Sequence, residues 1–229
     1  MNAAIAARFQ ELLQLRSAPV AVSFVDEIPA GLERGGGEPA GCGYWRRAAE
    51  GEVFYTEPED HLRCPIGAHT HGVDMPEGAK TELNGMLKMM VELGYLRMDE
   101  VPGIPHRLEP LRYAVYGPYG RTPVPADAVL FRGPARQMML LAEAASAAGV
   151  AGEMPAMGRP TCAVLPAAIG SGKTAASFGC AGNRIYTAAR DEDAYFAVPG
   201  SALDAVAEKL AVIAKANIAL EAFHRSRVN

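Results

Sequence analysis

The sequence predicts one α+β domain over residues 1–229, with a mixed β-sheet, flanking helices and long loops rich in glycine and proline. Segments in which apolar residues alternate, typical of strands, are interspersed with segments of helical periodicity. The 24 glycines and 17 prolines among 229 residues indicate frequent turns. No internal repeat or long linker divides the chain, and its length suffices to bury a core without disulfides.

The first half of the chain is expected to hold two helices and two strands. The first helix places Phe9 and Leu13 on its apolar face, with Asn2 as its cap. Two stretches, 28–41 and 58–78, are rich in glycine, proline or histidine and are expected to be loops. The remaining elements are a strand over Pro19–Val25, a strand over Glu52–Tyr55 and a helix over Lys80–Leu93 that Gly94 ends.

The second half alternates expected strands and helices, and Gly117-Pro118 is expected to form a turn. The final helix is expected to start at Ser201, with Asp204 as a capping-box partner and Leu220 on its buried stripe. The other expected elements are strands over Arg112–Tyr116, Asp127–Phe131, Thr161–Leu165 and Tyr195–Val198, and a helix over Pro134–Ala148.

Charge and hydropathy narrow the classes of function. A net charge of −4 argues against nucleic acid or an anionic membrane as the main partner. No apolar run approaches the roughly 20 residues of a membrane span. Residues 1–16 lack the basic start and continuous apolar stretch of a signal peptide. We therefore expect a cytoplasmic protein whose cysteines are free, metal-bound or reactive and do not form structural disulfides.

Four cysteines carry the strongest chemical signal, although no C-x-x-C motif is present. Glycines flank Cys42 and Cys180, and a proline follows Cys64; such residues let a backbone approach a bulky inorganic group. Four thiolates complete either one four-iron cluster or one tetrahedral zinc site. The alternative is that free cysteines pack as small apolar residues, which suits Cys162 within Thr161–Leu165.

A second hypothesis is a binding protein or metal-free enzyme for a small anion. Arg63, Arg184 and the amides of Gly179 to Gly182 would hold the anion by charge-assisted hydrogen bonds. Cys64 or Cys180 would then be a reactive thiol whose pKa a neighbouring arginine lowers.

Histidines add a further candidate metal site. His61, His69 and His71 lie near Cys64 in one stretch and are potential zinc ligands, although a solvated polar loop is the simpler interpretation.

Residues 167–174 end in Gly172-Lys173-Thr174 and match a permissive form of the phosphate-binding loop. The following residues lack helical periodicity, whereas a true phosphate loop leads directly into a helix. We therefore expect an exposed Gly-Ser-Gly loop that does not bind nucleotide.

The chain resembles domain-of-unknown-function family 169, which is widespread in bacteria and archaea and largely uncharacterised. The resemblance is carried by Pro19–Phe24, by the spaced Cys42 and Cys64 with nearby glycines, and by Ala128–Phe131 followed by Pro134 and Gln137-Met138. Its most specific part is Ser177–Arg184, which follows an S-x-G-C-x-G-x-R pattern. The resemblance implies one compact cytoplasmic domain and a shared site at Cys64, Cys180 and Arg184.

From these observations we predict a metal- or iron–sulfur-binding protein with a redox or electron-transfer role. The suspected cofactor is a four-iron cluster, with zinc as the alternative, and the ligands are Cys42, Cys64, Cys162 and Cys180. The expected partner is a small molecule or an electron-transfer protein. Homo-oligomerisation stays open.

Overall fold

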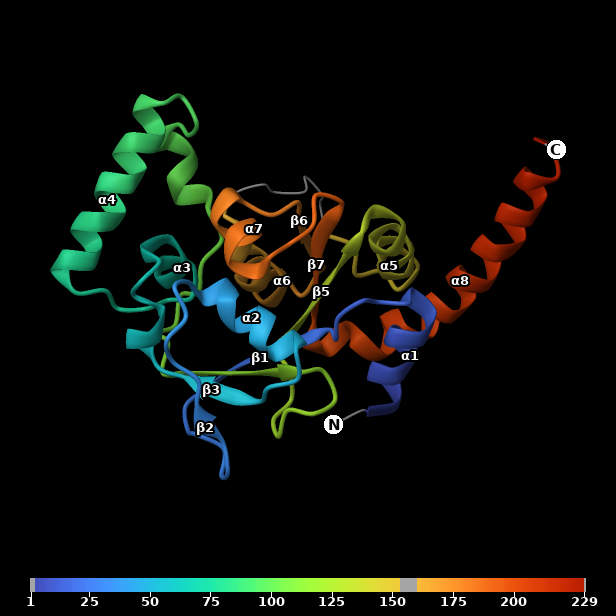
Figure 1. The fold of residues 1–229 in the computed structure, drawn as a ribbon, viewed down its shortest axis with the longest axis horizontal. Helices are drawn as coiled ribbons and strands as arrows, with labels where there is room; N and C mark the ends of the chain where they lie inside the picture. Colours follow the sequence, from blue (N-terminus) through green and yellow to red (C-terminus); the bar gives the residue numbers. More distant parts are fainter. Residues whose placement is uncertain (1–2, 153–159, 229) are drawn as a thin grey trace.

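A mixed β-sheet forms the centre of the molecule, as the sequence predicts (Figure 1). The computed structural model describes residues 3–152 and 160–228. Within them the strand order is β2-β3-β4-β1-β5-β7-β6; β2 and β3 run parallel, and every other neighbouring pair is antiparallel. The strands are β1 (Val20–Val25), β2 (Glu33–Arg34), β3 (Phe54–Thr56), β4 (Tyr113–Pro118), β5 (Ala128–Pro134), β6 (Ala175–Ser177) and β7 (Asp193–Pro199).

Helices connect the strands and cover both faces of the sheet. The α-helices are α1 (Ala3–Leu13), α2 (Gly41–Ala49), α3 (Pro65–Thr70), α4 (Glu77–Glu92), α5 (Ala135–Ala147), α6 (Val164–Ser171), α7 (Ala181–Thr187) and α8 (Leu203–Arg225). Short 3₁₀ segments are η1 (Pro58–His61), η2 (Met98–Gly103), η3 (Thr161–Ala163) and η4 (Gly200–Ala202). Among the described residues, no helix is long and apolar enough to cross a membrane.

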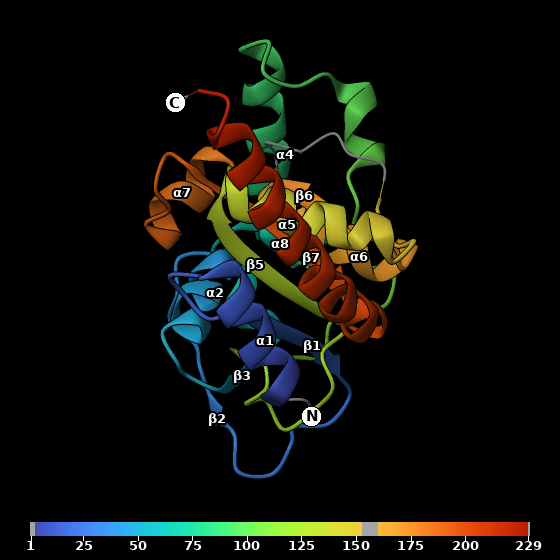
Figure 2. The ribbon, with the colours of Figure 1, turned by 90° about the vertical axis from the view of Figure 1, so that its right-hand side faces the viewer.

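Alternation along the central strands divides the core into two layers. In β5, Leu130 packs into one layer, whereas its neighbours Val129 and Phe131 pack into the other. Successive side chains of a strand point to opposite faces, so a strand with no exposed face must be apolar throughout. Helices α2, α3 and α6 cover the first layer, and α1, α5 and α8 cover the second (Figures 1 and 2).

Several sequence expectations need correction. Thr161–Leu165 is not a strand: it forms η3 and the start of α6, because a short apolar run does not distinguish a strand from a buried helix. The supposed loop over 58–78 contains η1 and α3, and Cys42, expected after a loop, lies on α2. Gly117-Pro118 belongs to β4 and is not a turn.

The last helix also differs from expectation. Ala202, not Ser201, is the N-cap of α8, and no side chain caps it, so the capping box with Asp204 is absent. Leu220 is 54% exposed because the outer half of α8 extends beyond the body of the molecule (Figure 1). The proposed cap Asn2 lies outside the described residues.

The phosphate-loop lookalike has the wrong order of elements. Helix α6 precedes the Gly172-Lys173 pair and ends at Gly172, whose φ of +65° gives a left-handed cap. The chain then enters β6, so the order is helix, loop, strand. A phosphate loop requires the reverse, because the helix that follows it presents free amides to the phosphates.

We therefore expect Lys173→Ala to leave the free energy of unfolding within about 0.5 kcal/mol of the original protein, because Lys173 is exposed. Urea unfolding measures this, and calorimetry with ATP and GTP should give no binding heat. Nucleotide binding that Lys173→Ala abolishes would contradict the assignment.

Candidate functional site

The four cysteines lie at the beginnings of four helical segments. Cys42 is the second residue of α2, Cys64 is the N-cap of α3, Cys162 lies in η3 directly before α6, and Cys180 is the N-cap of α7. The first amides of a helix have no partner within the helix and carry a partial positive charge. These positions therefore combine thiols with polarised backbone donors.

The fold brings the four cysteines into one region. Burial is the main reason that the pKa of Cys42 is raised to about 12, and negative charge at Cys64 and Cys180 adds to the rise. Burial also raises the pKa of Cys162, with charge at each of the other three cysteines contributing. The pKa of Cys64 is raised by burial and by charge at Cys180. All six pairs of the four cysteines therefore interact, although the residues are far apart in sequence.

Polar contacts tie the cysteine-bearing segments together. The backbone N–H of Cys180 donates to Oγ1 of Thr161 at 2.6 Å, which joins the start of α7 to η3. The thiol of Cys180 accepts from the N–H of Asn183 at 3.5 Å. The buried Asn183 side chain lies near Cys42 and lowers the pKa of that thiol, although its amide makes no well-aligned hydrogen bond among the described residues. On the other side, the hydroxyl of Thr70 of α3 donates to the carbonyl oxygen of Gly67 at 2.9 Å and lies near Cys162, whose pKa it lowers.

Polar groups beside the cysteines lack protein partners. The hydroxyl of Tyr116 is buried and interacts electrostatically with Cys42 and Cys162, yet no well-aligned hydrogen bond to it exists among the described residues. The indole Nε1 of Trp45, three residues after Cys42, is also buried without a partner there. Unpaired buried donors are uncommon in folded proteins and indicate that another group supplies the partner.

Two of the three candidate histidines are buried together beside α2. The rings of His61 and His71 stack with centroids 5.2 Å apart. Nε2 of His61 is 2.9 Å from Oγ1 of Thr56, and Nδ1 of His71 is 2.9 Å from the carbonyl oxygen of Gly67. A Cβ at Gly41 would lie 3.2 Å from Nδ1 of His61, so a larger residue there would crowd the buried imidazole.

His69 lies elsewhere, stacked on His106 at 4.8 Å. The histidines near Cys64 therefore do not converge as one ligand set. Among the described residues, no group of three or more His, Cys, Asp or Glu side chains is arranged to hold a single metal ion.

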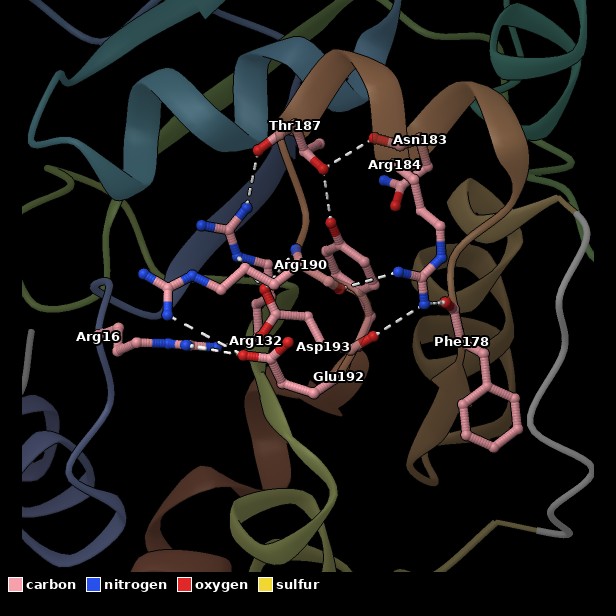
Figure 3. A network of polar contacts seen from close by, with 10 residues as sticks. Arg16, Arg132, Phe178, Asn183, Arg184, Thr187, Arg190, Glu192 and Asp193 are labelled. Carbon is pink, nitrogen blue, oxygen red and sulfur yellow. Dashed lines mark hydrogen bonds and ion pairs between the residues drawn. The ribbon is translucent and has the colours of Figure 1, made fainter.

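Arg184 fastens the loop that carries Cys180. Its guanidinium donates to the carbonyl oxygens of Arg190 at 2.9 Å, Phe178 at 2.5 Å and Asp193 at 3.1 Å (Figure 3). One planar group thus joins the residues before Cys180 to the start of β7. Arg184 is expected to bind an anion in the second hypothesis, but its guanidinium instead holds three backbone carbonyl oxygens together.

Arg63 and two of the amides expected to hold an anion make hydrogen bonds within the protein. Arg63 donates to the carbonyl oxygen of Gly37 at 3.2 Å. The N–H of Gly179 donates to Ser177, and the N–H of Cys180 donates to Thr161, so neither amide is free for a ligand. Gly179 has a φ of +85°, which favours glycine. At Gly182 a Cβ would make only ordinary contact with Tyr186, so close approach does not require glycine.

The expected lowering of a thiol pKa by an arginine is not found at Cys64. Burial raises its pKa instead. The sequence also gave no sign of the partnerless hydroxyl of Tyr116 or of the Asn183 contact with Cys42. Their only signal is position: each lies on an element that the fold places beside a cysteine.

Comparison with known proteins identifies a family but no characterised relative. The model of family DUF169, described as "Uncharacterised ArCR", matches residues 8–209, which confirms the resemblance seen in the sequence. No curated protein and no solved structure matches the chain.

We expect Arg184→Lys to lower the free energy of unfolding by about 1 kcal/mol, because a lysine cannot reach three carbonyl oxygens at once. Arg190→Lys is the matched control, since this arginine is 64% exposed and its ion pair with Glu192 is 4.0 Å long. Urea unfolding compares the two variants. Equal stability of both would show that the clamp contributes nothing.

We also expect the protein to lose stability in mild acid through His61 and His71. Burial is the main cause that lowers both pKa values, that of His71 to about 4 and that of His61 well below 6.5. The unfolded chain therefore binds more protons below pH 6.5. The free energy of unfolding should then fall by about 1.4 kcal/mol per pH unit for each histidine and stay level above pH 7.

Urea unfolding at pH 7.5, 6.0 and 5.0 measures this dependence. His71→Gln should reduce the slope, whereas His224→Gln, near the exposed end of α8, should leave it unchanged. If His71→Gln keeps the slope of the original protein, His71 is not a source of the acid sensitivity.

Proposed function

This chain belongs to domain-of-unknown-function family 169, and we propose that it holds an iron–sulfur cluster on Cys42, Cys64, Cys162 and Cys180 and serves in redox or electron-transfer chemistry. The observation that carries the proposal is the convergence of these four cysteines, with all six pairs interacting. Four thiolates are the usual ligand set of a four-iron cluster. When bound, such a cluster supplies a centre that takes up and releases single electrons.

The ligand geometry of the two groups leads us to propose a cluster before zinc. A tetrahedral zinc ion with bonds near 2.3 Å holds its sulfurs roughly 3.8 Å apart. The described side chains form no such single-ion group. A four-iron cluster binds each thiolate through a different iron, so its ligands stand farther apart. We therefore propose the larger group, and keep the single ion as the alternative.

The surroundings of the cysteines also suit an anionic sulfur-rich group. Each cysteine lies at the start of a helical segment, where backbone amides favour negative charge. The Asn183 side chain and the partnerless hydroxyl of Tyr116 lie beside Cys42. Hydrogen bonds to the sulfurs of a cluster tune its reduction potential, and these two groups are placed to donate them.

The raised thiol pKa values disfavour the alternative of a metal-free thiol enzyme. Cys42, Cys64 and Cys162 all have pKa values above the ordinary value, chiefly because they are buried. The nucleophile in cysteine chemistry is the thiolate, and reactive cysteines have lowered pKa values. Burial makes it costly to form a free thiolate, which keeps the free thiols unreactive. Iron ligation displaces the thiol protons and stabilises the thiolates, so a bound cluster would offset this cost.

The edge of the site at Cys180 faces the surface. Cys180 is half-buried, and two apolar side chains beside it are exposed, Phe178 by 59% and Ile185 by 76%. An electron-transfer partner needs such access, because electrons pass only over short distances. We propose this rim as the approach for the redox partner.

Anaerobic reconstitution with iron and sulfide tests the proposal. The original protein should turn brown, absorb broadly in the visible range and hold about four iron and four sulfide per chain. Cys64→Ser and Cys180→Ser should lose most of this content. Serine is a good N-cap, so it preserves the starts of α3 and α7 while replacing a soft ligand by a hard one.

The matched control is Ser23→Ala on β1, which removes the hydrogen bond that the buried Ser23 hydroxyl donates to the carbonyl oxygen of Pro125 at 2.8 Å. It should cost about 1 kcal/mol of stability and leave iron content unchanged. The proposal fails if the original protein binds no iron and sulfide, or if both serine variants keep their full content. Binding of a single zinc ion in place of iron would favour the alternative metal.

A further inference from the structure

Helix α8 carries apolar side chains on two of its sides. Val212 is 63% exposed and Phe223 is 50% exposed, and Ala216 and Ala219, which lie between them in the sequence, are exposed as well. Spacings of four, three and four residues place these four side chains, which we call the outer stripe, along one side of the helix. A different side of α8 packs into the second core layer, through Leu203, Val206, Ala207 and Leu210.

The outer stripe faces away from the body of the molecule. Glu221 accepts a hydrogen bond from Arg136 of α5 at 2.6 Å, so the side of α8 that bears Glu221 is turned toward α5. Phe223 lies two positions after Glu221, and residues two apart do not share a side of a helix. Seen from this direction, α8 crosses the front of the molecule with α5 behind it (Figure 2). The outer stripe is therefore accessible to another molecule.

The composition of this part of α8 calls for a partner on the exposed side. Between residues 211 and 223, the only polar residues are Lys215, Asn217 and Glu221. A helix that is apolar on more than one side is typically buried between neighbours, and a contiguous exposed apolar patch marks an interaction site. Leu220, four positions after Ala216 and 54% exposed, widens the stripe. The alanines in the middle of the stripe let another helix approach closely.

Charged residues border the outer stripe at both ends. Glu208 lies one turn before Val212; it is exposed and forms no ion pair within the described part of the chain. Arg227 lies one turn after Phe223; it is exposed, and its guanidinium carbon is 4.4 Å from the centre of the Phe223 ring. The outer side of α8 thus begins with a negative charge and ends with a positive charge.

The apolar residues of the stripe match in register when a second copy of α8 packs antiparallel on the first. In such a pair, two residues face each other when they lie equally far from the two-fold axis. With the axis between positions 217 and 218, Val212 faces Phe223 of the second copy. The same axis places Ala216 opposite Ala219 of the second copy. The small side chains therefore meet at the centre, and the larger ones close the contact on both sides.

The same axis also pairs opposite charges. It places Glu208 opposite Arg227 of the second copy, and by symmetry this pair occurs twice. In a parallel pair of helices each residue would instead face its own counterpart, so that glutamate would meet glutamate and arginine would meet arginine. Charge complementarity therefore favours the antiparallel order. Because exposed ion pairs add little affinity, the apolar stripe would supply most of the affinity and the charges the direction.

We propose that two copies of this chain form a homodimer through α8, with their outer stripes packed antiparallel and Glu208 of each copy beside Arg227 of the other. The contact is isologous, because the same residues serve both copies. Helix α8 packs on the second core layer, whereas α2, α3 and α6 pack on the first. The inference does not rest on the iron–sulfur proposal, because no cysteine lies on α8.

Analytical ultracentrifugation of the metal-free full-length protein, over a wide range of concentration, tests the proposal. The original protein should convert reversibly from monomer to dimer as its concentration rises. Phe223→Glu and Ala216→Glu should each raise the dissociation constant of the dimer about tenfold or more, because each places a charge in the apolar contact. Both positions are exposed in one copy, so the variants should fold, which circular dichroism checks.

Ile218→Glu is the matched control. Ile218 lies on the same helix and is 67% exposed, but it is two positions from Ala216 and one from Ala219, so it does not share their side. This change should leave the dissociation constant unchanged. A protein that is monomeric at every concentration would overturn the proposal, and so would stripe variants that associate as tightly as Ile218→Glu. Binding of a monomeric protein to phosphatidylglycerol vesicles would also overturn it, by assigning the stripe to a lipid surface.

An exchange of charges tests the antiparallel order. Glu208→Arg and Arg227→Glu should each weaken association, because each brings like charges together. The double variant should associate more tightly than either single variant, since opposite charges again face each other. If the double variant associates no better than the single variants, the antiparallel register is wrong and the proposal fails.

Discussion

The burial of both faces of the sheet is the constraint on which the rest of the structure depends. Because side chains of β1, β5 and β7 alternate between two apolar layers, helices must cover each face. Helices α1, α5 and α8 cover one face, and α2, α3 and α6 pack on the other. The cysteine-bearing segments pack on this second face or beside it, and their helices begin in the same region. The candidate site therefore forms because α2, α3 and α6 pack on the same face of the sheet.

The long elements could be predicted from the sequence, and the short ones could not. Strand β1 and helices α4 and α5 show clear periodicity, and their predicted ranges match the structure closely. Helices α2, α3, α6 and α7 have only six to nine residues and contain glycine or proline. One or two turns do not establish a period, and tertiary packing stabilises such helices more than intrinsic propensity does. These are the helices that carry the cysteines.

For the candidate site, too, the sequence shows local features but not the contacts between distant segments. The cysteines could be singled out by their neighbours, such as Gly41, Pro65 and Gly179. Their convergence could not be predicted, because contacts between distant segments create it. The sequence could narrow the role of Arg184 to two possibilities, because a guanidinium beside a glycine turn binds either an anion or carbonyl oxygens. Only the fold decides between them, by placing Phe178, Arg190 and Asp193 within its reach.

The pairing of β1 with β4 has a consequence for the order in which the protein assembles. Val20 pairs with Pro118, and Ala128 pairs with Pro199, so the central ladders join residues far apart in the chain. Loop closure must precede the gain from such contacts, which slows folding. Cys42 and Cys180 lie on segments that these long-range contacts bring into one region. The four thiols are therefore separate ligands in an unfolded chain and become one ligand set only through the tertiary fold, so binding of a cofactor at this site would be coupled to folding.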